Sequence, residues 1–394
     1  MVRKMKYIRF NQQMRWFGPL DPVSLSDIAQ AGCHGAVTAL HELPIGAVWS
    51  REAIQERKSL IHTFGLKWTV VESLPVHEDI KMRCGEFQQY IANYLESLRN
   101  LANSGIEVVT YNFMPVFDWV RTDIAYLLPN QSEALLYDQE KYELADLFLL
   151  ERPGARAEKE KVQLERLQEQ FDLIPEEEKQ ALFSCVFQAL PGSSTALRKD
   201  QVLAAIAQYE HIDAEGLRDN LVAFLEAIVP VAEEMGIQLA IHPDDPPFPV
   251  FGLPRIMSTE ADVRQIMSRV PSPVNGLCFC TGSFGAHPQN DLVKMLRKWG
   301  SRIHFFHLRN TKRDGPNRFW EASLLEGDVD MYKIVKGAIE LMHQEQRSIP
   351  MRPDHGHKML DDLGKDVYPG YGAIGRLKSL AELRGLEFAI SRTR

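Results

Sequence analysis

Four short stretches of the sequence place side chains that can bind a metal directly after apolar residues. His242 lies in AIHPDDPP, Cys280 in CFCTGS, His307 in FFHLRN and Asp354 in PMRPDHGH. Two imidazoles, one thiolate and one carboxylate are a workable ligand set for a divalent transition metal. These four residues are therefore a candidate metal site, provided that the fold brings them together.

Each of the four residues also has an ordinary structural explanation. A single histidine at a strand end is more often a hydrogen-bonded structural residue, Cys280 could be a small buried hydrophobe, and Asp354 could cap a helix. The joint pattern favours the metal, because donors recur at the same place in four successive apolar segments. Cys278 would face the same side of a strand as Cys280. We assign Cys280 because it adjoins the TGS turn, and assign Cys278 to the core.

The elements that must position these residues are short apolar runs, most of them followed by amphipathic helical stretches. Continuous apolar runs indicate parallel strands that are covered on both faces. Eight strands alternating with helices predict an α/β fold, a closed (β/α)₈ TIM barrel that spans residues 1–394 as a single domain. An open doubly wound sheet is the structural alternative. The predicted strands are 14–18, 35–40, 66–73, 106–113, 237–243, 276–282, 302–309 and 348–356.

One region interrupts this alternation. Residues 148–216 are charged and helical in pattern, and we predict no strand there. They are expected to form a helical insertion between the fourth and fifth barrel strands. Two interpretations stay open for it, a solvated extension without a role in the chemistry, and a lid or oligomer contact.

Further polar residues lie beside the candidate ligands or at the ends of the first four predicted strands. In a (β/α)₈ barrel, catalytic groups come from the C-terminal ends of the strands, so these residues would surround the metal. A ring of mixed donors and acceptors suits a sugar acid with a carboxylate and several hydroxyls, although each residue could instead serve a local turn. The residues are Arg309 and His355 beside the ligands, and Arg15, Trp16, His41, Glu72, Tyr111, Asn112 and Asp118 on the earlier strands.

The bulk composition is that of a soluble globular protein. The chain has 394 residues, 45% of them hydrophobic and 25% charged, and a formal charge of −8, which opposes nucleic acid or an anionic membrane as the main partner. An odd number of cysteines, five in a long chain, suits a reducing compartment, and neither a signal peptide nor a membrane span is predicted. We expect a cytoplasmic protein that forms a homo-oligomer, a dimer.

Several long strings in the sequence resemble the mannonate dehydratase family, in its long bacterial form. They include RWFGPLDPVSLSDIAQAG, YNFMPVFDWVRTD, HPDDPP, CTGSFG, HLRNTKRD, MRPDHGHKMLDD and PGYGAIGRLKSLAELRG, and the resemblance covers nearly the whole chain. It implies a xylose-isomerase-like TIM barrel. It also implies dehydration of D-mannonate to 2-dehydro-3-deoxy-D-gluconate in glucuronate (hexuronate) catabolism, with Mn²⁺ or Fe²⁺ as cofactor.

The resemblance also implies roles for individual residues. His242, Cys280, His307 and Asp354 match the metal ligands of the family. His355 and Tyr371 match its catalytic residues, with Tyr368 as the alternative tyrosine, and Arg309 matches an arginine that contacts substrate. We expect Tyr371 to take the C2 proton and His355 to protonate the leaving hydroxyl, with the opposite assignment open.

Other functions remain possible for the same residues. An aldose–ketose isomerase or another sugar-acid lyase could use the same metal-binding barrel. A metal-dependent DNA-repair endonuclease is opposed by the negative charge, and an inert scaffold barrel by the intact ligand set.

Overall fold

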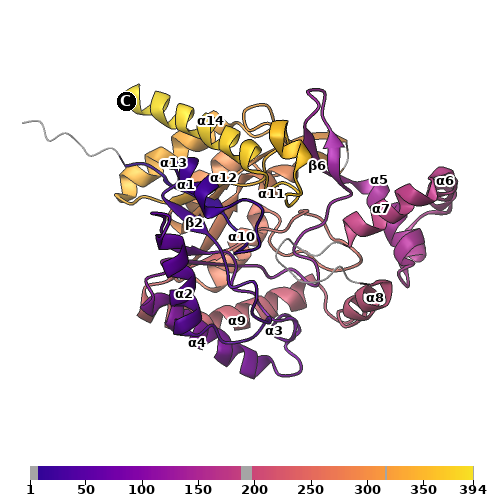
Figure 1. Cartoon of the computed structure of the whole chain (residues 1–394). Helices are drawn as coiled ribbons and strands as arrows, with labels where there is room; N and C mark the ends of the chain where they lie inside the picture. The colour runs from indigo at the N-terminus through magenta and orange to yellow at the C-terminus, as the bar shows by residue number, and fades with distance from the viewer. Residues whose placement is uncertain (1–7, 188–197, 316, 394) are drawn as a thin grey trace, which may run out of the picture.

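The computed structural model describes residues 8–187, 198–315 and 317–393, and its centre is a sheet of eight parallel strands (Figure 1). Bridges from Gly35 to Lys67 and from Thr38 to Val71 join β2 to β3 and nearly close the sheet into a barrel. The predicted (β/α)₈ fold is confirmed. In spatial order the strands are β2 (Gly35–Val37), β1 (Asn11–Arg15), β12 (Pro350–Pro353), β9 (Ile303–Leu308), β8 (Asn275–Cys280), β7 (Gln238–Ile241), β4 (Val108–Tyr111) and β3 (Val70–Val71).

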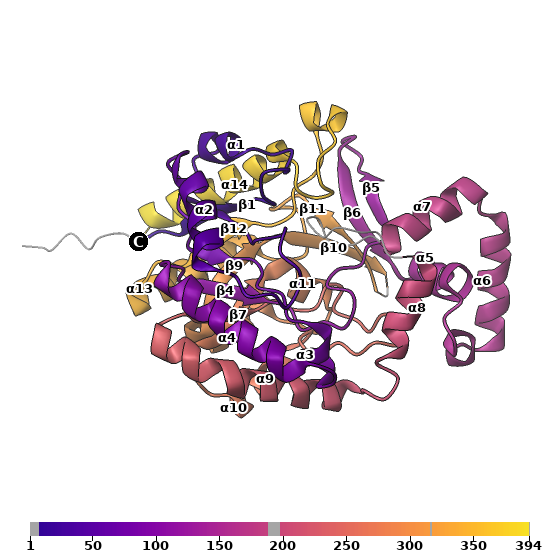
Figure 2. The same ribbon diagram turned by 60° about the horizontal axis from the view of Figure 1, so that its bottom comes forward.

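Helices cover the outside of the barrel (Figures 1 and 2). The first begins at Ser24, whose side chain accepts a hydrogen bond from the Asp27 N–H, and Gly32 follows its end with a φ of 72° that favours glycine. No helix in the described part of the chain is both long and apolar enough to cross a membrane. The outer helices are α1 (Leu25–Gln30), α2 (Arg51–His62), α4 (Phe87–Asn103), α9 (Ala214–Met235), α10 (Glu260–Arg269), α12 (Leu292–Trp299), α13 (Met331–Glu345) and α14 (Ala373–Arg392).

The barrel interior contains a layer of small and apolar side chains that is separate from the helix-facing core. Side chains alternate between the two faces of a strand, so the residue two positions further along each strand points the same way. The side chains two residues after the members of this layer are therefore expected to point toward the C-terminal mouth of the barrel. Its buried members are Val37, Val70, Val108, Ala240, Cys278 and Phe305.

Between β4 and β7 the chain leaves the barrel. The region expected to be a helical insertion, 148–216, contains α6 (Lys161–Leu173), α7 (Glu176–Val186) and α8 (Lys199–Ala207), and no strand lies in its described part; residues 188–197 are outside the described residues. These helices project from one side of the barrel (Figure 2).

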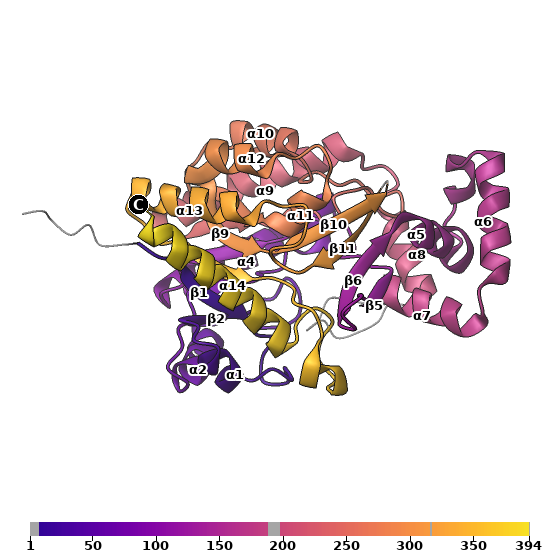
Figure 3. The same ribbon diagram turned by 90° about the horizontal axis from the view of Figure 1, so that it is seen from above.

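A second, antiparallel sheet was not predicted. Its strands run in the order β10 (Asn310–Gly315), β11 (Arg318–Ala322), β6 (Glu133–Asp138) and β5 (Asp123–Leu127). The sheet joins a hairpin that follows the seventh barrel strand to a hairpin that follows the fourth. It lies between the barrel and the helices α5 (Gln139–Leu144) to α8 (Figure 3).

Candidate active site

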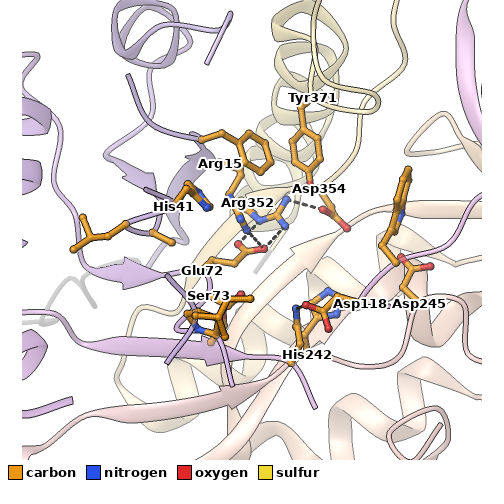
Figure 4. A pocket seen from close by; sticks show the side chains of 18 of the residues that line it. Arg15, His41, Glu72, Ser73, Asp118, His242, Asp245, Arg352, Asp354 and Tyr371 are labelled. Carbon is orange, nitrogen blue, oxygen red and sulfur yellow. Dashed lines mark hydrogen bonds and ion pairs between the residues drawn. The ribbon is translucent and has the colours of Figure 1, made fainter. Parts of the chain in front are cut away.

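A cavity of about 280 Å³ opens at the C-terminal mouth of the barrel. Its polar lining comes from positions one layer above the apolar interior, because Glu72, Thr110 and His242 each lie two residues after a member of that layer. Figure 4 shows side chains from both halves of the chain converging on this cavity. The alternation of side chains along each strand therefore places polar residues from distant segments around one cavity.

The candidate metal ligands meet beside this cavity. The ligand atoms of His242, Cys280 and His307 all lie within 4.8 Å of one another. Asp354 adjoins the group, since its Oδ2 lies 3.5 Å from the sulfur of Cys280, although it is not part of the three-residue cluster. The structure therefore brings the four predicted ligands together, with Asp354 on the Cys280 side.

The donor atoms of this cluster are suited to a divalent cation. The Nδ1 of His242 lies 2.7 Å from the Pro243 carbonyl oxygen, so it carries the proton and leaves Nε2 free; burial lowers the pKa of His242, which keeps the ring neutral. The Nε2 of His307 is buried and faces a Glu72 oxygen 3.3 Å away, and its Nδ1 lies 3.4 Å from the Arg352 guanidinium. A neutral imidazole with a free nitrogen, as in His242, is what metal binding requires.

The sulfur of Cys280 has hydrogen-bond donors around it. The backbone N–H and the hydroxyl of Ser283 lie 3.4 and 3.3 Å from the sulfur, in the first turn of α11 (Thr281–Ala286). Such contacts from neighbouring groups orient a cysteine ligand toward a metal. The residues present thus fit a divalent transition metal.

Arg352 holds two carboxylates at the cavity wall (Figure 4). It donates to both oxygens of Glu72 at 2.8 and 2.7 Å and to Asp354 at 2.6 Å, and Arg15 pairs with Glu72 at 2.6 Å. Burial acts to raise the pKa of each carboxyl, but the neighbouring guanidiniums outweigh it, and both pKa values lie well below the ordinary range. Glu72 and Asp354 are therefore ionised.

Arg309 is buried and also pairs with carboxylates. It contacts Asp245 at 2.9 Å and both Glu321 and Asp354 at 3.2 Å. Asp245 in turn accepts two hydrogen bonds from Arg121, at 2.6 and 3.0 Å. Each arginine that lines the cavity is thus already paired with a carboxylate.

A histidine and a tyrosine form a pair on the cavity wall. The Nε2 of His355 lies 3.1 Å from the Tyr371 hydroxyl, and its Nδ1 lies 2.8 Å from Oε1 of Glu321. Burial raises the pKa of Tyr371 to about 12, so its hydroxyl is protonated at neutral pH and can donate to His355. Tyr368, the alternative tyrosine, does not line the cavity and instead packs edge-on against Phe17.

The other residues expected to bind substrate divide into two groups. Trp16 and Tyr111 do not line the cavity, because they follow the inward-facing residues Arg15 and Thr110 and so point to the opposite side of their strands. Trp16 packs against the guanidinium of Arg57, and Tyr111 is fully buried near Phe224. For these two residues the structure corrects the expectation. The cavity is lined by Arg15, His41, Glu72, Asn112 and Asp118, as expected.

Three residues of the site were not assigned a role from the sequence. Asp245 and Arg352 had a signal, since each lies within three residues of a predicted ligand, in HPDDPP and MRPD. Glu321 had none, because it lies on β11, in a hairpin whose existence was not predicted.

Comparisons with known proteins agree with the sequence resemblance. The D-mannonate dehydratase (UxuA) family model matches residues 10–394. The mannonate dehydratase of Chromohalobacter salexigens is 51% identical over 381 residues, which is 95% of this chain and 97% of that protein. The mannonate dehydratase of a Marinomonas species is 49% identical over 387 residues, 96% of this chain and 98% of that protein.

Solved structures give the same result. The crystal structure of mannonate dehydratase from Streptococcus suis has a TM-score of 0.77 and 34% identity, and the match covers 98% of this chain and 95% of that one. A xylose isomerase-like TIM barrel protein from Mycobacterium smegmatis, at 16% identity and a TM-score of 0.51 over 97% of both chains, shares the fold. The chain belongs to the D-mannonate dehydratase family and is therefore a hydro-lyase.

Proposed function

We propose that this enzyme dehydrates D-mannonate to 2-dehydro-3-deoxy-D-gluconate in glucuronate degradation, with Mn²⁺ or Fe²⁺ held by His242, Cys280, His307 and Asp354. The observation that carries the proposal is the juxtaposition, at one cavity, of a metal-ligand cluster and the His355–Tyr371 pair. The names of the similar proteins support the substrate.

The charges at the cavity indicate what a metal would add. Arg15, Arg309 and Arg352 are each paired with a carboxylate of the protein, so none is a free cation for the carboxylate of the substrate. When bound, the divalent ion supplies Lewis-acid stabilisation for the negative charge that develops on that carboxylate as the C2 proton leaves. A thiolate ligand suits Fe²⁺ at least as well as Mn²⁺.

The His355–Tyr371 pair supplies the proton transfers. A proton passes from the Tyr371 hydroxyl to Nε2 of His355, 3.1 Å away, which gives a tyrosinate base and an imidazolium acid. Tyr371 then takes the C2 proton and His355 gives its proton to the C3 hydroxyl, which leaves as water. The enol product tautomerises to the ketone, and both side chains return to their starting states. Such acid–base steps contribute about 10²–10⁴-fold each.

The remaining cavity residues bind and orient the polyol. His41 lines the cavity with a buried Nε2 that has no partner, and burial together with Arg15 lowers its pKa to about 3, so it is a neutral partner for a hydroxyl. Asn112 is held by Asp118, to which its amide donates at 3.0 Å. These groups suit hydroxyls rather than a second carboxylate.

The test is keto-acid formation followed by ultraviolet absorbance. Anaerobically purified enzyme with Mn²⁺ or Fe²⁺ is expected to convert D-mannonate, and D-altronate and D-xylose serve as controls. Elemental analysis of the same preparation is expected to find one of these metals. Absence of keto acid from D-mannonate with the metal bound, or full activity after exhaustive chelation, would contradict the proposal.

A further inference from the structure

Glu321 brings a carboxylate into the active site from outside the barrel. It lies on β11 of the antiparallel sheet, and its side chain is 3% exposed. Its Oε1 is 2.8 Å from Nδ1 of His355, 3.0 Å from Arg121 and 3.2 Å from Arg309. The backbone carbonyl of the same residue lies 2.8 Å from Nε2 of His357. Two contacts thus fix β11 against the segment that carries His355.

The surroundings of Nδ1 decide where its hydrogen lies. Arg309 also approaches Nδ1, at 2.8 Å, but a guanidinium can only donate and a carboxylate can only accept. The same Arg309 nitrogen also forms ion pairs with Glu321 and Asp354, each at 3.2 Å, so its charge is balanced by carboxylates as well. We assign the Nδ1 hydrogen to Glu321, the carboxylate acceptor at 2.8 Å, which leaves the lone pair of the neutral ring on Nε2.

Glu321 is ionised in this environment. Burial acts to raise its pKa, but Arg309, His355 and Arg121 outweigh burial, and the pKa lies below the ordinary value. A charged acceptor makes a stronger hydrogen bond than a neutral acceptor, and a buried hydrogen bond does not compete with bonds to water.

We propose that Glu321 is a positioning residue for the reaction: it fixes the ring orientation of His355 with Nδ1 protonated, so that Nε2 faces the Tyr371 hydroxyl. This inference rests on the proposed function, because Glu321 acts only through the His355–Tyr371 pair. It gives the antiparallel sheet a role, since β11 supplies a residue that the barrel itself lacks at this place.

The experiment compares Glu321→Gln with Glu321→Met, which have similar length but differ in the acceptor oxygen. In the glutamine variant, the N–H groups of Arg121 and Arg309 orient the amide with its oxygen toward His355, so the positioning contact survives. Glu321→Met is expected to lower kcat by about 10²–10⁴-fold, the range for a lost acid–base contribution, with KM for D-mannonate changed little. Glu321→Gln is expected to retain clearly more kcat than Glu321→Met.

Arg318→Met is the control on the same strand, because Arg318 pairs with Asp138 and Asp314, which do not line the cavity, and has no contact with His355. It is expected to keep the wild-type kcat. Glu321→Ala replaces Glu321→Met if the latter does not fold. Equal kcat losses in the glutamine and methionine variants, a loss that Arg318→Met shares, or an unchanged kcat would each overturn the inference.

A crystal structure of Glu321→Met gives a readout independent of turnover. The His355 ring is expected to rotate and lose the 3.1 Å contact with Tyr371. If the ring keeps that contact, Glu321 does not position it. If wild-type enzyme forms no keto acid from D-mannonate, the proposed function fails while this structural result still stands on its own.

Discussion

At the scale of single residues, two neighbouring tyrosines are expected to have different roles, one in catalysis and one in packing. Tyr371 lines the cavity and contacts His355, whereas Tyr368 does not line the cavity and packs on Phe17. We predict that Tyr371→Phe lowers kcat by about 10²–10⁴-fold, because it removes a proton-transfer group without changing the shape of the side chain. Tyr368→Phe is expected to leave kcat close to wild type. Steady-state kinetics with D-mannonate measures both.

The same experiment decides between the two tyrosines that the sequence left open. A large kcat loss in Tyr368→Phe together with a small one in Tyr371→Phe would reverse the assignment. Metal content, measured on the same preparations, is expected to stay unchanged in both variants, because neither hydroxyl belongs to the ligand cluster.

The two cysteines of β8 form a second matched pair. Cys280 is in the ligand cluster, whereas Cys278 packs with Phe305 and Ala240 inside the barrel. We predict that Cys280→Ser loses most of the bound metal, because a neutral hydroxyl replaces a thiolate. Cys278→Ala is expected to bind metal as the wild type does, with lower stability from the lost packing. Elemental analysis after anaerobic purification is the measurement, and equal metal content in the two variants would contradict the assignment.

At the scale of elements, the barrel strands were predictable because both their faces are buried. GLCFC is a continuous apolar run and every residue of IHFFHL is buried, and the ends of both strands mark the layer where polar groups become functional. The strands of the second sheet carry no such signal. In β5 the sequence DIAYL is partly exposed, and β10 is the polar string NTKRDG, which forms a strand only because β11 pairs with it. Tertiary pairing, and not local pattern, creates these elements.

The dependence on tertiary pairing also explains which site residues the sequence could identify. The ligands lie at or directly after the C-terminal ends of barrel strands, so their convergence is a consequence of the barrel. Trp16 and Tyr111 adjoin strand ends too, but which neighbour points inward depends on the register of the strand, which a run of apolar residues does not fix. Glu321 depends on a pairing between hairpins that lie far apart in the chain.

Arg121 joins the elements that surround the site. It is fully buried after β4 and pairs with Asp245, which follows β7, and with Glu321 of β11. We predict that Arg121→Met lowers the free energy of unfolding by about 3–5 kcal/mol, because it leaves buried carboxylates with fewer cations. In Arg318→Met the lost ion pair with Asp138 is partly exposed, and the expected loss is about 0–1 kcal/mol. Urea unfolding of both variants measures the difference, and similar losses would refute the prediction.

At the scale of the whole molecule, stability in acid depends on buried groups outside the cavity, and His304 is one of them. It lies on β9, 4% exposed, with Nε2 3.1 Å from the carbonyl oxygen of Pro273. Burial, with a smaller effect of Arg347, lowers the pKa of His304 from its ordinary value of 6.5 to about 3. The folded protein therefore keeps this imidazole neutral at a pH where the unfolded chain protonates it.

The sign of the pH dependence follows from this difference. Between about pH 6.5 and pH 3 the unfolded state binds the additional proton, so the contribution of His304 is fully present above pH 6.5 and is lost as the pH falls. From pH 7 to pH 5 the loss is about 2 kcal/mol. We predict that the free energy of unfolding of His304→Gln falls by about 2 kcal/mol less over this interval than that of the wild type. Replacement of the exposed His211 by Gln is the control and should leave the wild-type slope unchanged. Denaturant unfolding at both pH values measures the slopes, and parallel curves for wild type and His304→Gln would show that His304 is not held neutral by the fold.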